Sequence, residues 1–517
     1  MYSWAADLES LRKSAGPSEE LRVAVTFRRP DAKPGPIKFD APLSLESVKD
    51  FVPDPLEMDR AICELGKRGF ELTGRGRLTV SMRCKKDKFE KVFGTKLKKK
   101  DLDPEQNYAT HSFYFPPRGA RWKPDKVIEN LIDDACIQWP QIWPMAGNKS
   151  PSSRKKVASK GSAVRGQALP STNPPNVNYF HLVPNDIPSL LNATKVHRAG
   201  NTGEGIRVVM IDTGFAHRSH PFFAANGFNS TVDLAFGAVN DETDRIGHGT
   251  GESANFFSVA PGATFIGVKV DSEDGKRERA CTLEAFQTAL QHRPHIICIS
   301  KGADLRNKKT KKQFSKLPRN LVPLQVEIQA AVASGIIVVF SAGNGEFSFP
   351  AMMPDVISVG GVFVDKRGNM RASDMASAFD TKIYSGRHVP DFCGLVGMNE
   401  YGDRYIMLPV PPHCTMDQLC SIGPEGTGTS DGWAAFSGTS AAAPQIAGVC
   451  ALLKAKNPNL TPSDIKAVLR RTARSVLVGC SNPACSDDGK TPLKAGPGDD
   501  GATGAGLADA FSAWQQV

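Results

Sequence analysis

Apolar and polar residues follow two different patterns along the chain. In the first part, β-rich runs and runs with helical spacing occur in turn: a strand at 21–27 (LRVAVTF), a helix at 56–69, a strand at 77–84 (RLTVSMRC) and a helix at 86–97, in which Gly94 is a stop signal. This order predicts a small N-terminal α/β domain, which we assign to residues 1–144.

After residue 178 the pattern changes to short apolar runs that end in glycine or a polar residue. Such runs are typical of buried parallel strands, and they occur at 205–214, 264–270, 295–302, 335–344 and 355–362. Helical spacing occurs between them at 283–292 and 324–334. The pattern predicts a doubly wound, mostly parallel sheet with helices on both faces over residues 179–517. Functional residues are then expected at the carboxyl ends of the strands.

The segment between these two regions, residues 145–178, has a different composition. The stretch GNKSPSSRKKVASKGSAVRGQALPSTNPPN contains six basic residues, no acidic residue and no hydrophobic period. We expect an exposed, flexible linker. Segments of this kind are also preferred sites of proteolytic cleavage.

Composition narrows the class of protein. The 517 residues are 40% hydrophobic and 23% charged, with 64 Lys and Arg against 54 Asp and Glu for a net charge of +10, as in folded globular proteins. An apolar run long enough to span a membrane is absent from the sequence. The first residues, MYSWAADLESLRKSAG, lack the apolar core of a secretory signal, which favours a cytoplasmic location and leaves non-standard secretion open.

The eleven cysteines include no pair of CxxC units, which excludes a zinc ribbon. Cys298 and Cys450 lie in apolar runs and are interpreted as small core residues. Two pairs, Cys414 with Cys420 and Cys480 with Cys485, lie in loops and are close enough in sequence for local disulfides in an oxidising compartment. Without a signal peptide, free thiols are favoured.

Three short motifs carry the candidate chemistry. They are IDTG with Asp212 at the end of a strand, GHGTGES with His248 at the start of a helix, and FSGTSAAAPQ with Ser440 at the start of another helix. Each motif alone is weak, but the order Asp, His, Ser with this spacing resembles the subtilisin-like serine peptidases. The resemblance extends from about Leu190 to the C-terminus and includes HGT followed by APGA, SKG, FSAGN followed by FPA, and GAGLADA.

The resemblance implies a serine endopeptidase that works through an acyl-enzyme. Ser440 is then the nucleophile, His248 the base that takes its proton, and Asp212 the carboxylate that orients the imidazole. Pro444 is tolerated best in the first turn of a helix, so a helix is expected to begin near Ser440. The oxyanion donors are then the Ser440 main-chain N–H and the Asn344 side chain.

The resemblance also implies two strand-end walls of a substrate cleft. They are formed by Ser300, Lys301 and Gly302, and by Ser341, Ala342 and Gly343. Backbone pairing of this kind recognises substrate with little dependence on sequence, and pockets supply the preference. Lys301, where the family usually has an apolar residue, and Asp304 depart from the pattern, so the preferred substrate side chain is left unassigned.

A peptidase with an N-terminal α/β unit and a linker open to cleavage suggests a zymogen. The VFGTKL stretch resembles a segment in prodomains of the related sedolisins, although the catalytic motifs do not fit that group. We expect the N-terminal domain to be an intramolecular inhibitor that is cut off between 145 and 178. The alternative is a partner-binding or targeting domain that stays attached.

Two insertions have alternative interpretations. The basic loop 306–319 is either a solvated loop or an exosite for an acidic partner. The segment 380–430, rich in Gly and Pro, is either a flap near the active site or a surface insertion.

The mechanism requires no metal or other cofactor. Structural calcium is an open possibility because hard oxygen ligands are present in three acidic loops: Asp241–Glu242–Asp244, Asp487–Asp488 and Asp499–Asp500.

Two other classes of function remain as alternatives to a peptidase acting on protein or peptide substrates. One is a catalytically silent relative that binds peptides in the cleft. The other is a basic nucleic-acid-associated protein, which the net charge and the Lys/Arg-rich stretch 83–100 allow but which no known nucleic-acid-binding module in the sequence supports.

Overall fold

The computed structural model covers the chain with gaps. It describes residues 20–27, 48, 51–101, 112–115, 122–138, 170–175, 180–271, 280–307, 310–398, 403–420, 428, 430–486 and 488–517. Of the predicted linker 145–178, only 170–175 lies within the described residues. None of the helices in these ranges is long and apolar enough to cross a membrane.

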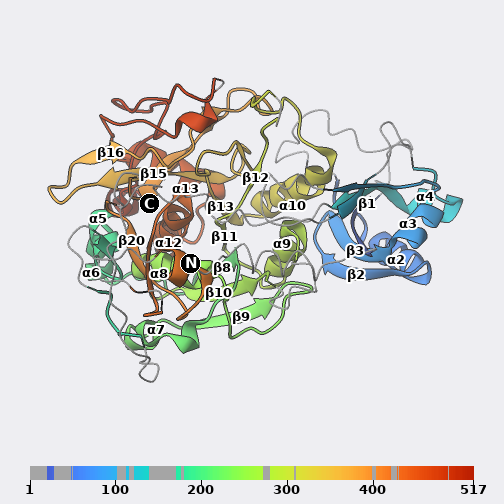
Figure 1. Cartoon of the computed structure of the whole chain (residues 1–517), viewed down its shortest axis with the longest axis horizontal. Helices are drawn as coiled ribbons and strands as arrows, with labels where there is room; N and C mark the ends of the chain where they lie inside the picture. Colours follow the sequence, from blue (N-terminus) through green and yellow to red (C-terminus); the bar gives the residue numbers. More distant parts are fainter. Residues whose placement is uncertain are drawn as a thin grey trace, which may run out of the picture.

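A four-stranded antiparallel sheet forms the N-terminal unit (Figure 1). In spatial order its strands are β2 (Phe70–Arg75), β3 (Thr79–Lys85), β1 (Glu20–Phe27) and β6 (Ile132–Gln138). The other elements of the unit are helices α2 (Pro55–Lys67), α3 (Lys86–Val92) and α4 (Lys126–Leu131), and the hairpin strands β4 (Lys98–Asp101) and β5 (Ser112–Phe115). The predicted strands and helices are present, although the helix predicted at 86–97 ends at Val92. The elements β2, β4, β5, β6 and α4 were not predicted.

Both faces of this sheet are covered. Leu21, Val23 and Val25 of β1 belong to a separate N-terminal core with residues of α2 and α3. The alternate positions of β3, such as Ser81 and Arg83, are buried as well. They lie on the opposite face, which packs against the helices of the larger unit. All of β1 except Glu20 and all of β3 except Lys85 are therefore buried, rather than every second residue.

The larger unit is built on the predicted parallel sheet. Its strand order is β16 (Met370–Ala372), β15 (Ile357–Val364), β13 (Ile337–Ser341), β11 (Ile296–Ile299), β8 (Arg207–Asp212), β10 (Thr264–Lys269) and β9 (Ser230–Leu234), with β19 (Phe392–Leu395) paired to β15. All neighbouring pairs are parallel except β15 with β16. The predicted doubly wound fold is therefore confirmed.

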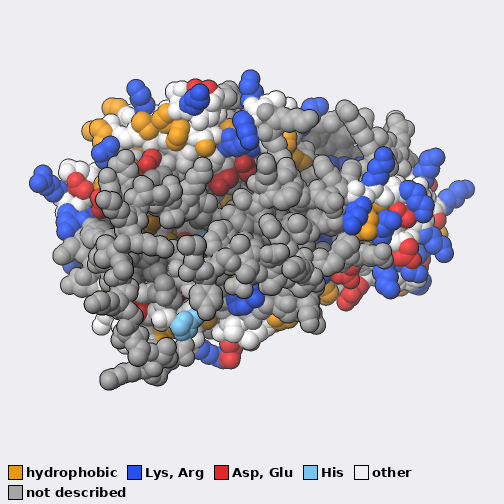
Figure 2. All heavy atoms as spheres, in the orientation of Figure 1, with side chains coloured by type: hydrophobic (Ala, Val, Ile, Leu, Met, Phe, Trp, Pro, Cys, Tyr) orange, Lys and Arg blue, Asp and Glu red, His pale blue; other side chains and the backbone are white. Residues whose placement is uncertain are grey.

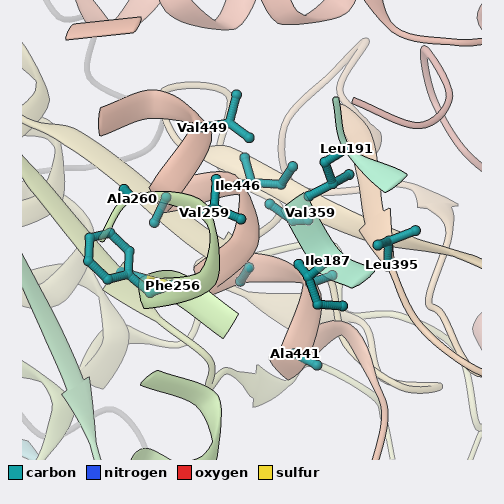
Figure 3. Packing of buried hydrophobic residues seen from close by; sticks show 14 of the residues in the cluster. Ile187, Leu191, Phe256, Val259, Ala260, Val359, Leu395, Ala441, Ile446 and Val449 are labelled. Carbon is teal, nitrogen blue, oxygen red and sulfur yellow. The ribbon is translucent and has the colours of Figure 1, made fainter. Parts of the chain in front are cut away.

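Helices cover both faces of this sheet (Figure 1). On one face, α8 (His248–Val259) and α12 (Thr439–Lys456) pack on residues such as Met210 and Val339, together with the short α5 (Asp186–Leu190). Figure 3 shows this packing, with Phe256 of α8, Ile446 of α12 and Leu395 of β19 among the labelled residues of the cluster. On the other face, α9 (Thr282–Gln291) and α10 (Val322–Ala333) pack on the alternate strand residues.

The remaining elements are short. They are β7 (His181–Leu182), α6 (Ala193–Arg198), α7 (Pro221–Ala225), β12 (Ala303–Asp304), β14 (Ser348–Phe349), β17 (Phe379–Asp380), β18 (His388–Val389), β20 (Ile406–Pro409), α11 (Thr415–Cys420), β21 (Trp433–Phe436), α13 (Pro462–Thr472) and α14 (Ala510–Gln515).

In the view of Figure 2, Lys and Arg side chains are dense over the N-terminal unit, where Asp and Glu side chains also occur. Lys88, Lys91 and Lys98 are among its exposed lysines.

Candidate active site

Asp212 is the last residue of β8, which lies between β10 and β11 inside the large sheet. Its side chain is fully buried. Oδ1 accepts hydrogen bonds from the Thr213 main-chain N–H at 2.7 Å and from His248 Nδ1 at 2.8 Å. Because an ionised carboxylate can only accept, Nδ1 carries the proton, and Nε2 is left as the ring atom that can exchange a proton with a reactant.

His248 is the first residue of α8, as predicted, and its side chain is 17% exposed. The carboxylate of buried Asp244 holds the start of this helix. It accepts from the main-chain N–H groups of Gly247 at 2.9 Å and Thr250 at 3.0 Å, and from the hydroxyls of Thr250 and Thr213, each at 2.9 Å. Asp244 therefore caps the helix and ties it to the end of β8, which fixes where the imidazole lies.

Opposing effects act on the imidazole. Burial disfavours the charged form and lowers the pKa of His248, whereas the negative charge of Asp212 and its hydrogen bond to Nδ1 raise it. The carboxylates of Glu252 and Asp244 act in the same direction as Asp212, and the pKa of His248 rises to about 9. The neutral, proton-accepting form therefore accumulates as the pH enters the alkaline range.

Ser440 is the second residue of α12, as the motif predicted. The chain enters the helix through Gly438, whose φ of 132° is a conformation that favours glycine. Immediately before this turn, the ring of Phe436 at the end of β21 lies with its centroid 6.4 Å from that of His248.

The two helices that carry His248 and Ser440 run parallel. Gln445 Nε2 of α12 donates to Asn255 Oδ1 of α8 at 3.2 Å. Further along both helices, a Cβ on Gly448 would lie 2.7 Å from Cβ of Val259, so the backbones approach closely there. Since both contacts advance in the same direction, the two N-termini lie at the same end of the helix pair.

Pro444 lies in the second turn of α12, so the expectation that it marks the first turn was wrong. A proline lacks the N–H that would bond to the carbonyl four residues earlier, which is that of Ser440. The Ser300 hydroxyl takes that place and donates to the Ser440 carbonyl oxygen at 2.9 Å. In return, the Ser440 hydroxyl donates to the Ser300 carbonyl oxygen at 3.4 Å. The proline is thus accommodated by a side chain from the end of β11.

Asn344 follows β13 and is held by Thr439, the first residue of α12. Asn344 Oδ1 accepts from the Thr439 main-chain N–H at 2.9 Å and from its hydroxyl at 3.2 Å. The Thr439 hydroxyl also bonds to the main chain of Gly343, accepting from its N–H at 3.0 Å. Because Oδ1 is engaged, the side-chain NH₂ of Asn344 is the end left to donate to another group.

The predicted cleft-wall residues lie at two strand ends, after β11 and at the end of β13. They are the largely buried Ser300 and Lys301 with Gly302, and the buried Ser341 and Ala342 with Gly343. Gly302 has no room for a side chain, because a Cβ there would lie 2.1 Å from the Ser348 hydroxyl oxygen. Beyond Gly302, β12 pairs with β14, and the Asp304 carboxylate accepts from the Phe347 N–H at 3.0 Å.

Sequence reasoning missed three residues that organise the site. Asp244 was considered only as a calcium ligand, Thr439 was not considered, and Glu252 was overlooked although it lies four residues after His248 on one helix. The (i, i+4) spacing was the available signal for Glu252. A hydroxyl directly before Ser440 was the signal for Thr439.

The basic loop 306–319 is less solvated than its composition suggested. The Arg306 guanidinium donates to the carbonyl oxygens of Ala484, at 2.6 Å, and Gly345, and lies 4.5 Å from the Phe347 ring centroid. At the other end of the loop, Arg319 forms an ion pair with Asp134 of β6. The exosite stays a hypothesis for the part of the loop between them, in which 308 and 309 lie outside the described residues.

Part of the segment 380–430 packs beside the entry to α8. The N–H groups of Thr415 and Met416 donate to the carbonyl oxygens of Arg245 and Ile246, each at 2.9 Å. A Cβ on Gly247 would lie 2.3 Å from Cys414 Sγ. This part of the segment therefore braces the loop in front of the imidazole.

Acidic and cysteine side chains form no metal centre in the part of the chain that the structure describes: no group of three or more His, Cys, Asp or Glu is placed to hold an ion. Asp244 already accepts four hydrogen bonds from the protein, and Asp500 accepts three from its own turn. Cys480 and Cys485 are free thiols. The Cys420 side chain lies outside the described residues.

Several known proteins resemble part of this chain. Alkaline elastase YaB from Bacillus sp. (strain YaB) is 27% identical over 290 residues, which cover 54% of this chain and 61% of that protein. Subtilisin E from Bacillus subtilis (strain 168) is 26% identical over 311 residues, covering 57% and 67%. Subtilisin BL from Lederbergia lenta is 26% identical over 301 residues, covering 56% and 90%.

The chain therefore spans less than two thirds of the length of alkaline elastase YaB. A solved structure of a lanthipeptide protease matches with a TM-score of 0.47 and 20% identity over 64% of this chain and 93% of that one. Residues 203–506 match the family described as the subtilase family. The chain belongs to the subtilase family.

Proposed function

We propose that this chain hydrolyses peptide bonds through an acyl-enzyme, with Ser440 as nucleophile, His248 as base and Asp212 as the carboxylate that orients the base. The observation that carries the proposal is the 2.8 Å hydrogen bond between His248 Nδ1 and Asp212 Oδ1, at the head of a helix parallel to the one that Ser440 heads. Membership of the subtilase family supports the same reaction.

Each proton has a defined path in this mechanism. His248 Nε2 takes the hydroxyl proton of Ser440 as Oγ bonds to the substrate carbonyl carbon, and Asp212 stabilises the imidazolium that results. The imidazolium then gives this proton to the amine, and the carbon–nitrogen bond breaks. Water repeats the sequence on the acyl-enzyme and releases Ser440.

The negative charge that develops on the carbonyl oxygen is bound by two donors. One is the Ser440 main-chain N–H, in the first turn of α12, where N–H groups have no acceptor within the helix and the helix dipole is positive. The other is Asn344 Nδ2, whose orientation is supported by the bonds from Thr439 to Oδ1. Loss of one such donor typically raises the barrier by about 2.7–4 kcal/mol.

Peptide hydrolysis by the purified chain tests this function. We expect the wild type to cleave members of a peptide library, Ser440→Ala to cleave none, and Asn344→Ala to lose about 10²–10³-fold in kcat. Ser463→Ala, at an exposed site on α13, is the matched control. Equal cleavage by Ser440→Ala and wild type would overturn the proposal, and binding without cleavage would favour the silent peptide-binding relative.

We further infer that the N-terminal unit is an intramolecular inhibitor, because it docks on α9 and α10 through specific polar contacts. Glu327 of α10 accepts from the main-chain N–H groups of Arg77, at 2.9 Å, Leu78, at 2.7 Å, and Thr79, at the turn between β2 and β3. Gln287 of α9 donates to the Thr79 hydroxyl at 2.9 Å.

Charged side chains support the same docked arrangement. Glu284 of α9 is buried beside Arg83 of β3 and accepts from the Thr73 hydroxyl at 2.7 Å. Intact-mass analysis of the purified chain is the test: we expect the wild type to be cut between 145 and 178, and Ser440→Ala to stay whole. A single uncut mass for both would contradict self-processing and favour an attached partner-binding domain.

Substrate preference is proposed to depend on the residue after Ser300. Position 301 holds a buried lysine, whereas the family resemblance led us to expect an apolar residue there. The cleavage preferences of the wild type and Lys301→Leu on the same peptide library test this dependence. A changed preference is expected, and identical profiles would show that Lys301 does not set it.

A further inference from the structure

Glu252 is a second buried carboxyl group next to the imidazole of His248. It lies one turn further along α8, with a fully buried side chain. Its Oε1 is 3.8 Å from His248 Nε2, on the ring edge opposite the one that Asp212 binds. Among the described residues, this oxygen has no hydrogen-bond partner.

The other oxygen of Glu252 is held in place by a relay of amides. Oε2 accepts from Asn255 Nδ2 at 2.9 Å, and Asn255 Oδ1 accepts from Gln445 Nε2 of α12. Gln445 is in turn fixed to the main chain of Leu395, with Oε1 accepting from its N–H at 2.8 Å. The relay spans two helices and a strand, so the carboxyl group is built into the site rather than placed by a freely rotating side chain.

Burying such a carboxyl group lowers the stability of the folded protein, so its presence needs an explanation. A buried carboxylate without full hydrogen bonding destabilises a folded protein, and an apolar side chain would fill the interface between α8 and α12 without this cost. The energetic cost therefore points to a role at the neighbouring imidazole.

Several structural elements around the pair contribute titratable groups, whereas β21 contributes the apolar ring of Phe436. Asp212 comes from β8, and Asp244 from the loop before α8. The buried thiols of Cys298 on β11 and Cys450 on α12 have raised pKa values because of burial, so they stay neutral. On β10, Lys269 donates to the carbonyl oxygens of Asn240 and Thr243 at 2.7 and 2.8 Å.

The charge balance around the imidazole favours an extra proton. Three buried carboxyl groups, those of Asp212, Asp244 and Glu252, act on one imidazole. Burial raises the pKa of Glu252 to about 8, although the positive form of His248 opposes that shift. Two groups this close titrate as a unit rather than as separate residues.

We propose that Glu252 and His248 hold one proton between them in the resting site, and that this proton must leave before His248 can accept the proton of Ser440. This inference rests on the proposed function. The shared proton sits either on Nε2, as an imidazolium beside an ionised Glu252, or on Glu252 beside a neutral imidazole. In the first form Nε2 is already protonated, and in the second the protonated carboxyl group competes with Ser440 for the Nε2 lone pair. Once it is lost to water, Nε2 takes the Ser440 proton as Oγ bonds to the carbonyl carbon. The imidazolium then stands between two carboxylates until it protonates the leaving amine.

Glu252 is thus a positioning residue that sets the charge state of the base, and the dependence of kcat/KM on pH tests it. In Glu252→Gln, we expect the acid limb of the profile to move to lower pH by about one to three pH units, because one neighbouring negative charge is removed. Glu242→Gln, which removes the same charge from an exposed site before α8, is the matched control and should leave the limb in place.

A purely structural role for Glu252 predicts a different result. Lost packing would lower kcat/KM at every pH and leave the acid limb where it is in the wild type, which would overturn the inference. An active wild type with an unmoved limb in Glu252→Gln would leave the proposed function intact, so the two failures are distinguishable.

A second measurement depends neither on the folding of Glu252→Gln nor on enzyme activity. In the full chain carrying Ser440→Ala and ¹⁵N-labelled histidine, the ring nitrogens of His248 report its protonation by NMR. We expect His248 to titrate at a pH well above the ordinary histidine value of about 6.5. A transition at the ordinary value would overturn the shared proton.

Discussion

The Ser300 hydroxyl donates a hydrogen bond to the Ser440 carbonyl oxygen, which Pro444 leaves without its helical partner. This contact joins the end of β11 to the first turn of α12. It therefore connects a predicted wall of the substrate cleft to the predicted nucleophile. Since the Ser440 hydroxyl returns a bond to the Ser300 carbonyl oxygen, a change at either residue alters the position of the other.

A double-mutant cycle tests this relationship. Ser300→Ala leaves a buried carbonyl unsatisfied and should lower the free energy of unfolding by about 1–3 kcal/mol. Pro444→Ala restores an N–H to the helix, so Ser300→Ala should cost less in that background. Chemical denaturation of the four chains, all carrying Ser440→Ala to prevent proteolysis, measures the coupling. Strict additivity would contradict the link between Ser300 and Pro444.

The capping carboxylate of Asp244 should be needed for both stability and activity. An amide at this position keeps one acceptor oxygen but turns an NH₂ group toward donors, so Asp244→Asn should lose about 1–3 kcal/mol of stability. Because the cap positions His248, kcat/KM should fall at least tenfold. The control is Asp241→Asn, at an exposed site in the same loop. Equal kinetics for both variants would refute the positioning role.

Acid should destabilise the fold through three buried histidines. Burial lowers the pKa of His217 and His181 to about 3, and that of His220 to about 4. Between these values and the ordinary 6.5, the unfolded chain binds protons that the native chain does not. The free energy of unfolding should therefore fall as pH drops below 6.5, and rise again with increasing pH.

His217 offers a way to isolate one contribution to this acid sensitivity. The glutamine in His217→Gln does not titrate, so the slope of unfolding free energy against pH should decrease by up to about 1.4 kcal/mol per pH unit. Denaturation midpoints between pH 7 and pH 4 measure it. An unchanged slope would show that His217 is charged in the native state.

The N-terminal unit should loosen when its docking turn gains a methyl group. A Cβ on Gly76 would lie 2.3 Å from Glu327 Oε1, whereas a Cβ on Gly66 of α2 would meet nothing within 4 Å. Gly76→Ala should therefore speed amide hydrogen exchange in residues 73–79 of an uncut Ser440→Ala chain, and Gly66→Ala should not. Equal protection in both would contradict the docked arrangement.

The positions of the candidate catalytic residues in the fold could be predicted because their local surroundings are encoded in short segments. Asp212 ends an apolar run, and His248 and Ser440 each open a helix, which the structure reproduces. The inner strands of the parallel sheet were predictable for the same reason, since β8, β10, β11, β13 and β15 are short apolar runs followed by a polar residue or glycine. The strands β9, β16 and β19 were not predicted.

The remaining features depend on contacts between distant segments. Nothing near Pro444 reveals that Ser300 will satisfy the carbonyl it frees, 140 residues away. The turn at Gly76 can be interpreted as a docking site only from its contact with Glu327, which lies 250 residues after Arg77 in the sequence. The role of Glu252 depends on amides from another helix, although its spacing from His248 was visible in the sequence.

The central claim is that the Ser440 hydroxyl becomes nucleophilic through His248 and Asp212. The most direct measurement is mass-mapped labelling with a fluorophosphonate, which forms a covalent bond with an activated serine. We predict one adduct, on Ser440, in the processed wild type, and at most residual labelling in His248→Ala. An adduct on another serine, or labelling of His248→Ala at the wild-type rate, would contradict the account.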